Sequence, residues 1–140
     1  MRANRTDLLG RQERPPQGTR LLIVDDEPAM RHLLQKFFAS EGYATEVAED
    51  VADAHAHIAA KTPAVVLLDL MMPGQTGLDF LRTRKDDTLL RTVPVIVLSA
   101  VMRDNGAEAR ALGATACVDK PFDLDILSAV VRACVSQTPS

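Results

Sequence analysis

The chain has 140 residues and a formal net charge of -3, and 46% of its residues are hydrophobic, 25% charged and 4% aromatic. This length suits one domain that buries about 68% of the surface of its unfolded chain, and the composition is typical of globular proteins. Five arginines and two acids give residues 1–20 a balance of +3, so residues 21–140 carry -6. Such an acidic part does not bind nucleic acid by charge alone. No run is apolar enough for a signal peptide or a membrane span, so we expect neither.

Composition divides the chain into three expected segments. Residues 1–19 form a flexible extension rich in Arg and Pro, residues 20–136 a folded domain, and residues 137–140 a tail. The two cysteines, Cys117 and Cys134, lack the spacing of a metal site, which favours a reduced, cytoplasmic protein.

Five short apolar runs predict strands, and periodic segments between them predict helices. The strands are expected over residues 21–24, 44–48, 65–68, 93–98 and 116–118. The helices are expected over residues 28–40, 50–60, 77–84, 103–112 and 123–135. Five successive strand-helix units predict an α/β fold, a doubly wound parallel sheet of five strands with helices on both faces.

Carboxylates follow two of the most apolar strands. Asp25 and Asp26 follow the first strand, and Asp69 follows the third. In the flavodoxin-like strand order 2-1-3-4-5 these strands are neighbours, so the three acids would meet at the carboxyl edge of the sheet. Carboxylates that close need a cation, and hard oxygen ligands with open positions suit Mg²⁺. His55 is predicted to be a packed core or boundary residue, and His32 and His57 are predicted to face solvent. No pair of these histidines has a partner carboxylate at ligand spacing, so no zinc site is expected.

Ser99 and Lys120 follow the fourth and fifth strands. With the acids they form the set that phosphoryl transfer to a carboxylate requires: an Asp nucleophile, a divalent ion, a cation for the phosphoryl oxygens and a hydroxyl. Each residue alone has a simpler interpretation, since Asp25 or Asp26 could cap a helix, Ser99 could belong to a turn and Lys120 could be solvated. Their common position at strand ends favours the functional interpretation.

Four motifs, LLIVDDEP, LLDLMMPGQTGLDFL, VPVIVLSA and DKPF, resemble those of the CheY-like receiver domains of two-component response regulators. The resemblance implies that Asp69 is the phosphoacceptor. It implies that Asp26, Asp69 and the Met71 backbone carbonyl bind Mg²⁺, with Asp25 acting mainly through water. It also implies that Ser99 and Lys120 contact the phosphoryl group, and that the Lys120–Pro121 bond is cis.

The same resemblance implies the function. A histidine kinase or phosphotransfer protein would phosphorylate Asp69, and the surface formed by the last two helices and the strand between them would then control an effector protein or domain, or pair with a second copy. The chain would be no enzyme beyond its own phosphorylation and dephosphorylation. Cys117 stands where the family usually has an aromatic switch residue, which leaves the usual coupling open.

Two rivals remain at this point. One is a receiver-like binding module that works without phosphorylation. The other is a hydrolase with an aspartyl-phosphate intermediate; such enzymes usually carry a second Asp two residues after the nucleophile, and Met71 occupies that position. The sequence also leaves open whether the domain stands alone or belongs to a longer regulator or hybrid kinase.

Overall fold

The computed structural model describes residues 15–70, 77–87, 90–100 and 105–137. Its five strands form one parallel sheet in the order β2-β1-β3-β4-β5, which confirms the predicted fold class and strand order. The strands are β1 (Arg20–Val24), β2 (Ala44–Ala48), β3 (Val65–Asp69), β4 (Val95–Ala100) and β5 (Ala116–Lys120). Because all five are parallel, their carboxyl ends lie at one edge of the sheet.

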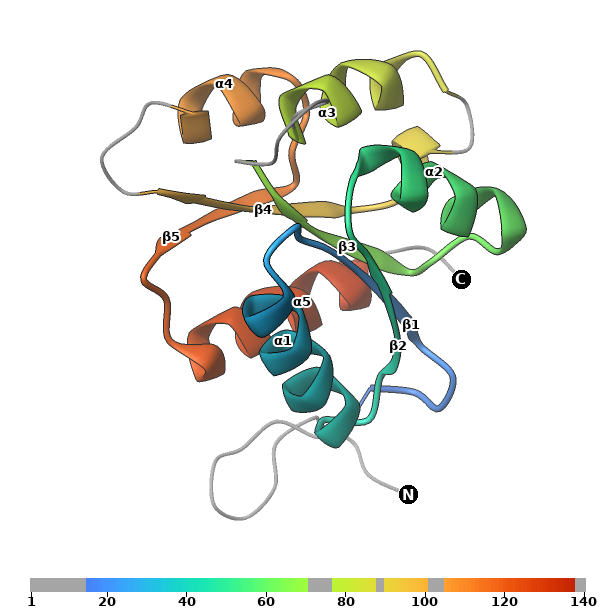
Figure 1. Cartoon of the computed structure of the whole chain (residues 1–140), viewed down its shortest axis with the longest axis vertical. Helices are drawn as coiled ribbons and strands as arrows, with labels where there is room; N and C mark the ends of the chain where they lie inside the picture. Colours follow the sequence, from blue (N-terminus) through green and yellow to red (C-terminus); the bar gives the residue numbers. More distant parts are fainter. Residues whose placement is uncertain (1–14, 71–76, 88–89, 101–104, 138–140) are drawn as a thin grey trace.

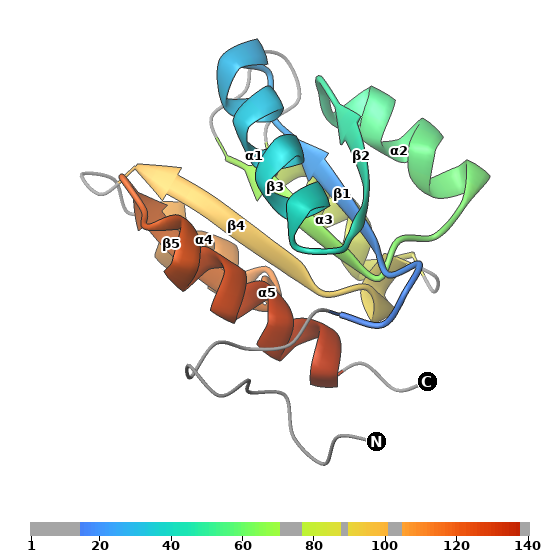
Figure 2. The ribbon, with the colours of Figure 1, turned by 90° about the horizontal axis from the view of Figure 1, so that it is seen from below.

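Helices cover both faces of this sheet, as Figure 1 and the turned view in Figure 2 show. Helices α1 and α5 lie on one face, and α2, α3 and α4 lie on the other. The elements are α1 (Pro28–Ser40), α2 (Val51–Ala60), α3 (Gly77–Lys85), the 3-10 turn η1 (Leu90–Thr92), α4 (Asn105–Ala111) and α5 (Leu124–Gln137). No helix in these described ranges is both long and apolar enough to span a bilayer.

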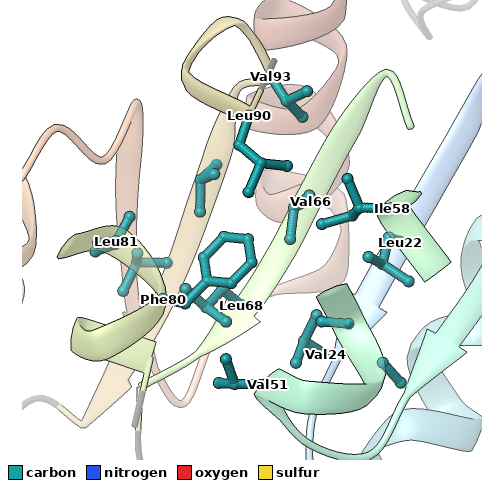
Figure 3. Close-up of a cluster of buried hydrophobic side chains, with 14 of the residues drawn as sticks. Leu22, Val24, Val51, Ile58, Val66, Leu68, Phe80, Leu81, Leu90 and Val93 are labelled. Carbon is teal, nitrogen blue, oxygen red and sulfur yellow. The ribbon is translucent and has the colours of Figure 1, made fainter. Parts of the chain in front are cut away.

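Two apolar cores lie on the two faces, because successive residues of a buried strand point to opposite sides. On β3, Val66 and Leu68 face the core beneath α2 and α3, where Phe80 is its largest side chain (Figure 3). Val65 and Leu67 face the other core, together with Phe38 of α1. Both faces of β3 are therefore buried, and the strand forms a rigid support for Asp69 at its end.

Two strands extend further than their apolar runs predict. Strand β4 includes Ser99 and β5 includes Asp119 and Lys120, since the parallel pairing continues through Ser99 with Asp119 and Ala100 with Lys120. Backbone hydrogen bonds determine where a ladder ends, and polar side chains at a sheet edge do not interrupt them. The extension makes Ser99 and Asp119 direct neighbours on adjacent strands.

The histidine predictions are partly confirmed. His55 packs against Phe80, with ring centroids 5.2 Å apart. His57, which is predicted to face solvent, has a side chain that is 35% exposed, and its Nδ1 lies 3.0 Å from Glu46 Oε1. Glu46 belongs to the neighbouring strand β2, a contact that helical spacing within α2 cannot reveal.

A buried arginine links three segments beside α4. The guanidinium of Arg84 donates hydrogen bonds to the backbone carbonyls of Val93, Arg91 and Gly113. Burial lowers the pKa of Arg84. Gly113, which has a φ of 100° and ends the turn after α4, adopts a conformation that favours glycine. Arg84 thus ties α3 to the turn that leads into β5.

Candidate active site

Three carboxylates meet at the carboxyl edge of the sheet. One ligand oxygen from each of Asp25, Asp26 and Asp69 lies within 4.8 Å of the others. Asp25 and Asp69 are buried, with exposures of 1% and 4%, and Asp26 is half-buried. The structure therefore brings Asp69 together with two acids that lie more than forty positions earlier in the sequence.

Asp25 is held by backbone contacts at the start of α1. Its Oδ1 accepts a hydrogen bond from the Glu27 amide (2.9 Å), and its carbonyl accepts one from the Arg31 side chain (2.8 Å). The helix itself begins with Pro28 and has no side-chain cap at Glu27. One oxygen of Asp25 thus has a local structural role, while the other remains available to the acid cluster.

Burial raises the pKa of Asp25 to about 6, and the carboxylates of Asp69 and Asp26 act in the same direction. The hydrogen bond from Glu27 and the charge of Lys120 oppose this shift. A carboxyl with such a pKa is mostly ionised at neutral pH, and any added positive charge nearby stabilises its ionised form further.

The acid cluster fits a magnesium ion. Asp25 Oδ2 is buried and has no hydrogen-bond partner among the described residues, which is a costly arrangement that a cation relieves. The donors are carboxylate oxygens, and Mg²⁺ commonly takes only one or two carboxylates and keeps several waters. Met71, whose backbone carbonyl was predicted as a further ligand, lies outside the described residues.

Lys120 reaches Asp69 from β5. Its Nζ lies 3.2 Å from Asp69 Oδ1, and the lysine side chain is 29% exposed whereas that of Asp69 is 5% exposed. The Lys120–Pro121 peptide bond is cis, as predicted. The ammonium group is therefore in direct contact with the carboxylate that the sequence singles out as reactive.

Ser99 lies at the same edge of the sheet, but its hydroxyl donates to a residue outside the acid cluster. The side chain is 1% exposed, and Oγ donates to Asp119 Oδ1 over 3.4 Å. Reasoning from the sequence identified Ser99 but missed Asp119, because the fifth strand was expected to end at residue 118. The strand register, which pairs residues 99 and 119, is the signal that reveals the contact.

Gly77 is a second residue that sequence reasoning missed as part of the site. A Cβ at this position would lie 2.8 Å from the Asp69 carbonyl oxygen and 2.9 Å from Leu70 Cα, which is closer than atoms can approach without displacing the backbone. Glycine therefore lets α3 begin directly against the end of β3. A glycine that opens a helix just after a site-bearing strand could have signalled this close approach.

A match to a known protein family identifies the domain. Residues 21–132 match the response regulator receiver domain family. The chain belongs to this family. Receiver domains act in two-component systems as switches that phosphorylation controls, and such domains are generally not classical enzymes. The family resemblance inferred from the four motifs is thereby confirmed.

Relatives and solved structures agree with this assignment. The chain is 35% identical to the phosphate regulon transcriptional regulatory protein PhoB of Pseudomonas aeruginosa, over 86% of this chain and 53% of that protein. It is 38% identical to the response regulator MprA of Mycobacterium bovis, over 86% of this chain and 52% of that protein. The receiver domain of NtrX from Brucella abortus has a TM-score of 0.78 at 30% identity, covering 84% of this chain and 98% of that one. The chain thus spans about half the length of the curated relatives it matches.

Cys117 stands at the position to which the family resemblance assigns an aromatic switch residue. Cys117 is half-buried on β5 and packs against the core beneath α4. Burial raises the pKa of its thiol, and a hydrogen bond with the Arg110 side chain of α4 opposes that shift. A thiol has no ring that could turn inward, so β5 and α4 are linked here by a smaller side chain and a polar contact.

Proposed function

We propose that Asp69 accepts a phosphoryl group from the phosphohistidine of a cytoplasmic histidine kinase or a phosphotransfer protein. The observation that carries this proposal is the contact between the Asp69 carboxylate and Lys120 Nζ at 3.2 Å, inside a cluster of three acids. The burial of Asp69 at the end of β3 supports it, because a buried carboxylate is shielded from water and held in one place.

The proposed transfer forms one bond and breaks one. An Asp69 carboxylate oxygen attacks phosphorus, the P–N bond of the phosphohistidine breaks, and the departing imidazole nitrogen takes the electron pair and becomes protonated. Lys120 donates hydrogen bonds to the phosphoryl oxygens, which carry the charge in the transition state. Ser99 is proposed to bind a phosphoryl oxygen of the product.

Asp26, Asp69 and the Met71 carbonyl are the proposed ligands of Mg²⁺, with Asp25 acting mainly through water. When bound, the ion neutralises the phosphoryl oxygens and lets three acids and a phosphoryl group coexist. The buried Asp25 oxygen without a partner among the described residues supports this assignment.

The new phosphoryl group adds roughly -1.5 to -2 charge beside β3, and we propose that α4, β5 and α5 carry the response to a partner. That partner is an effector protein or domain, or a second copy of the chain. Hydrolysis of the aspartyl phosphate resets the switch, and no other reaction is proposed. Residues 1–19 and 137–140 are proposed to flank the folded domain, with Gln137 as the last residue of α5; residues 1–14 and 138–140 lie outside the described residues.

A small-molecule phosphodonor tests the proposal directly. Acetyl phosphate with Mg²⁺ is expected to add one phosphoryl group to the chain by intact mass, and Asp69→Asn is expected to abolish the gain. Chelation of the metal should abolish it as well. Asp86→Asn, which alters an exposed acid at the end of α3, is the matched control and should label like the parent. A parent that stays unlabelled would favour the receiver-like binding module instead.

A further inference from the structure

The hydrogen bond between Ser99 and Asp119 suggests a role for a residue outside the acid cluster. Ser99 Oγ donates to Asp119 Oδ1, and Ser99 is almost fully buried while Asp119 is exposed. A hydroxyl shielded from water needs an acceptor from the protein. Asp119 supplies it from the neighbouring position on β5.

The strand order shows to which side of β4 the Ser99 hydroxyl is directed. Strand β4 lies between β3 and β5, so a hydroxyl of β4 that bonds to β5 is directed to the opposite side from β3, which carries Asp69. The next residue on β5, Lys120, reaches Asp69. Two consecutive residues of β5 therefore have different contacts in the site. Lys120 contacts the Asp69 carboxylate, and Asp119 accepts the hydrogen bond of the Ser99 hydroxyl.

We propose that Asp119 is a positioning residue that holds the Ser99 hydroxyl on β5 and so opposes the phosphorylated state. The inference rests on the proposed function, since it concerns the hydroxyl that would bind the phosphoryl group on Asp69. Asp119 acts through Ser99 and touches no reacting atom.

Hydrogen-bond capacity gives the physical reason. A serine hydroxyl has one proton to donate, so Ser99 cannot donate to Asp119 and to a phosphoryl oxygen at once. Binding of the phosphoryl group must therefore break the bond to Asp119. The contact is long for a hydrogen bond and its acceptor is exposed, so the competition is modest. Removing the carboxylate should favour the phosphorylated state by roughly threefold to tenfold.

A double-mutant cycle with beryllofluoride, a stable phosphoryl mimic, tests this in the full chain. Beryllofluoride affinity with Mg²⁺ is measured by fluorine NMR for the parent, Asp119→Val, Ser99→Ala and the double variant. Asp119→Val should bind about threefold to tenfold more tightly than the parent. In the Ser99→Ala background the same substitution should change nothing, because no hydroxyl remains to be held. Asp119→Ala serves as a second substitution, and circular dichroism checks the folding of all variants.

The cycle separates the inference from its rivals. If loss of the Asp119 charge acted by reducing repulsion of the anion, the gain would persist in the Ser99→Ala background, and the inference would be overturned. Equal affinities of the parent and Asp119→Val would overturn it too, while leaving Asp69 as the acceptor. A parent that neither binds beryllofluoride nor gains a phosphoryl group from acetyl phosphate would overturn the proposed function and this inference together.

Discussion

The central strand β3 and the edge strand β5 contribute residues to the same site, but they differ in burial and in the number of strands that pair with them. All five residues of β3 are buried, and it has neighbours on both sides. On β5 four residues are half-buried, Asp119 is exposed, and only β4 pairs with the strand. The proposed acceptor carboxylate, Asp69, therefore lies on the rigid strand, whereas Lys120 and Asp119, which are proposed to respond to its phosphorylation, lie on the strand that can shift at lower cost.

The largest expected effect on activity comes from removing what β5 contributes to the chemistry. Lys120→Met should slow phosphorylation by acetyl phosphate about 100-fold, because one charged donor to the transferring group is lost. The initial labelling rate followed by mass spectrometry measures it. Lys85→Met, at an exposed position on α3, is the control. A rate within about twofold of the parent would mean that the contact with Asp69 is structural only.

The next effect concerns Arg84, which joins α3 to the turn before β5. Arg84→Met should lower the free energy of unfolding by roughly 3 kcal/mol, because the Val93 carbonyl loses its donors in a buried setting and the carbonyls of Arg91 and Gly113 lose theirs in a partly buried one. Urea denaturation measures the change.

Arg82 provides the matched control two positions away on the same helix. It forms ion pairs with Asp79 (2.9 Å) and Glu108 (3.0 Å), but its side chain is 51% exposed. Arg82→Met should cost less than about 1 kcal/mol. Equal losses for the two arginines would contradict a special role for burial at Arg84.

A pH-dependent effect is expected at Asp25, which follows β1, the other buried central strand. Its pKa of about 6 lies above the ordinary value of 3.8, so the folded state binds this proton more tightly than the unfolded state. Stability contributed by the proton is present at low pH and is lost as pH rises from about 4 through 6. Asp25→Asn, which cannot ionise, should therefore gain roughly 2 kcal/mol relative to the parent between pH 4 and pH 7.5 when metal is chelated.

Urea denaturation at the two pH values measures this gain, and Asp86→Asn at an exposed position is the control. Added Mg²⁺ should stabilise the parent more at pH 7.5 than at pH 4, because protons compete with the ion for the carboxylates. A parent and an Asp25→Asn variant with the same pH dependence would contradict the assigned pKa.

Most of the fold could be predicted from the sequence, because strands and helices are marked by local sequence patterns. Continuous apolar runs that end in acids mark the buried strands, and Asp123, at the start of the last periodic segment, accepts the amides of Asp125 and Ile126. The meeting of the acids followed from parallel strand direction together with strand order, which the resemblance supported.

The remaining features depend on partners distant in sequence. Arg84 reads as an exposed cation at the end of a short helix, and its carbonyl partners lie in two other segments. Asp119 reads as a polar residue beyond a strand, and only the pairing of β4 with β5 places it beside Ser99. Side-chain direction and strand length at a sheet edge are decided by tertiary contacts, which spacing along the chain does not encode.

The smallest effect, a difference of about 1 to 2 kcal/mol between two variants, tests the comparison of the two strands directly. Val66 of β3 is 1% exposed, whereas Val118 of β5 is half-buried. The same truncation removes two methyl groups from each, so Val66→Ala should cost about 2 to 3 kcal/mol and Val118→Ala about 1 kcal/mol. Paired urea denaturation curves measure the difference. If both substitutions cost the same, β5 is held as firmly as β3, and the response to phosphorylation has to begin outside this strand.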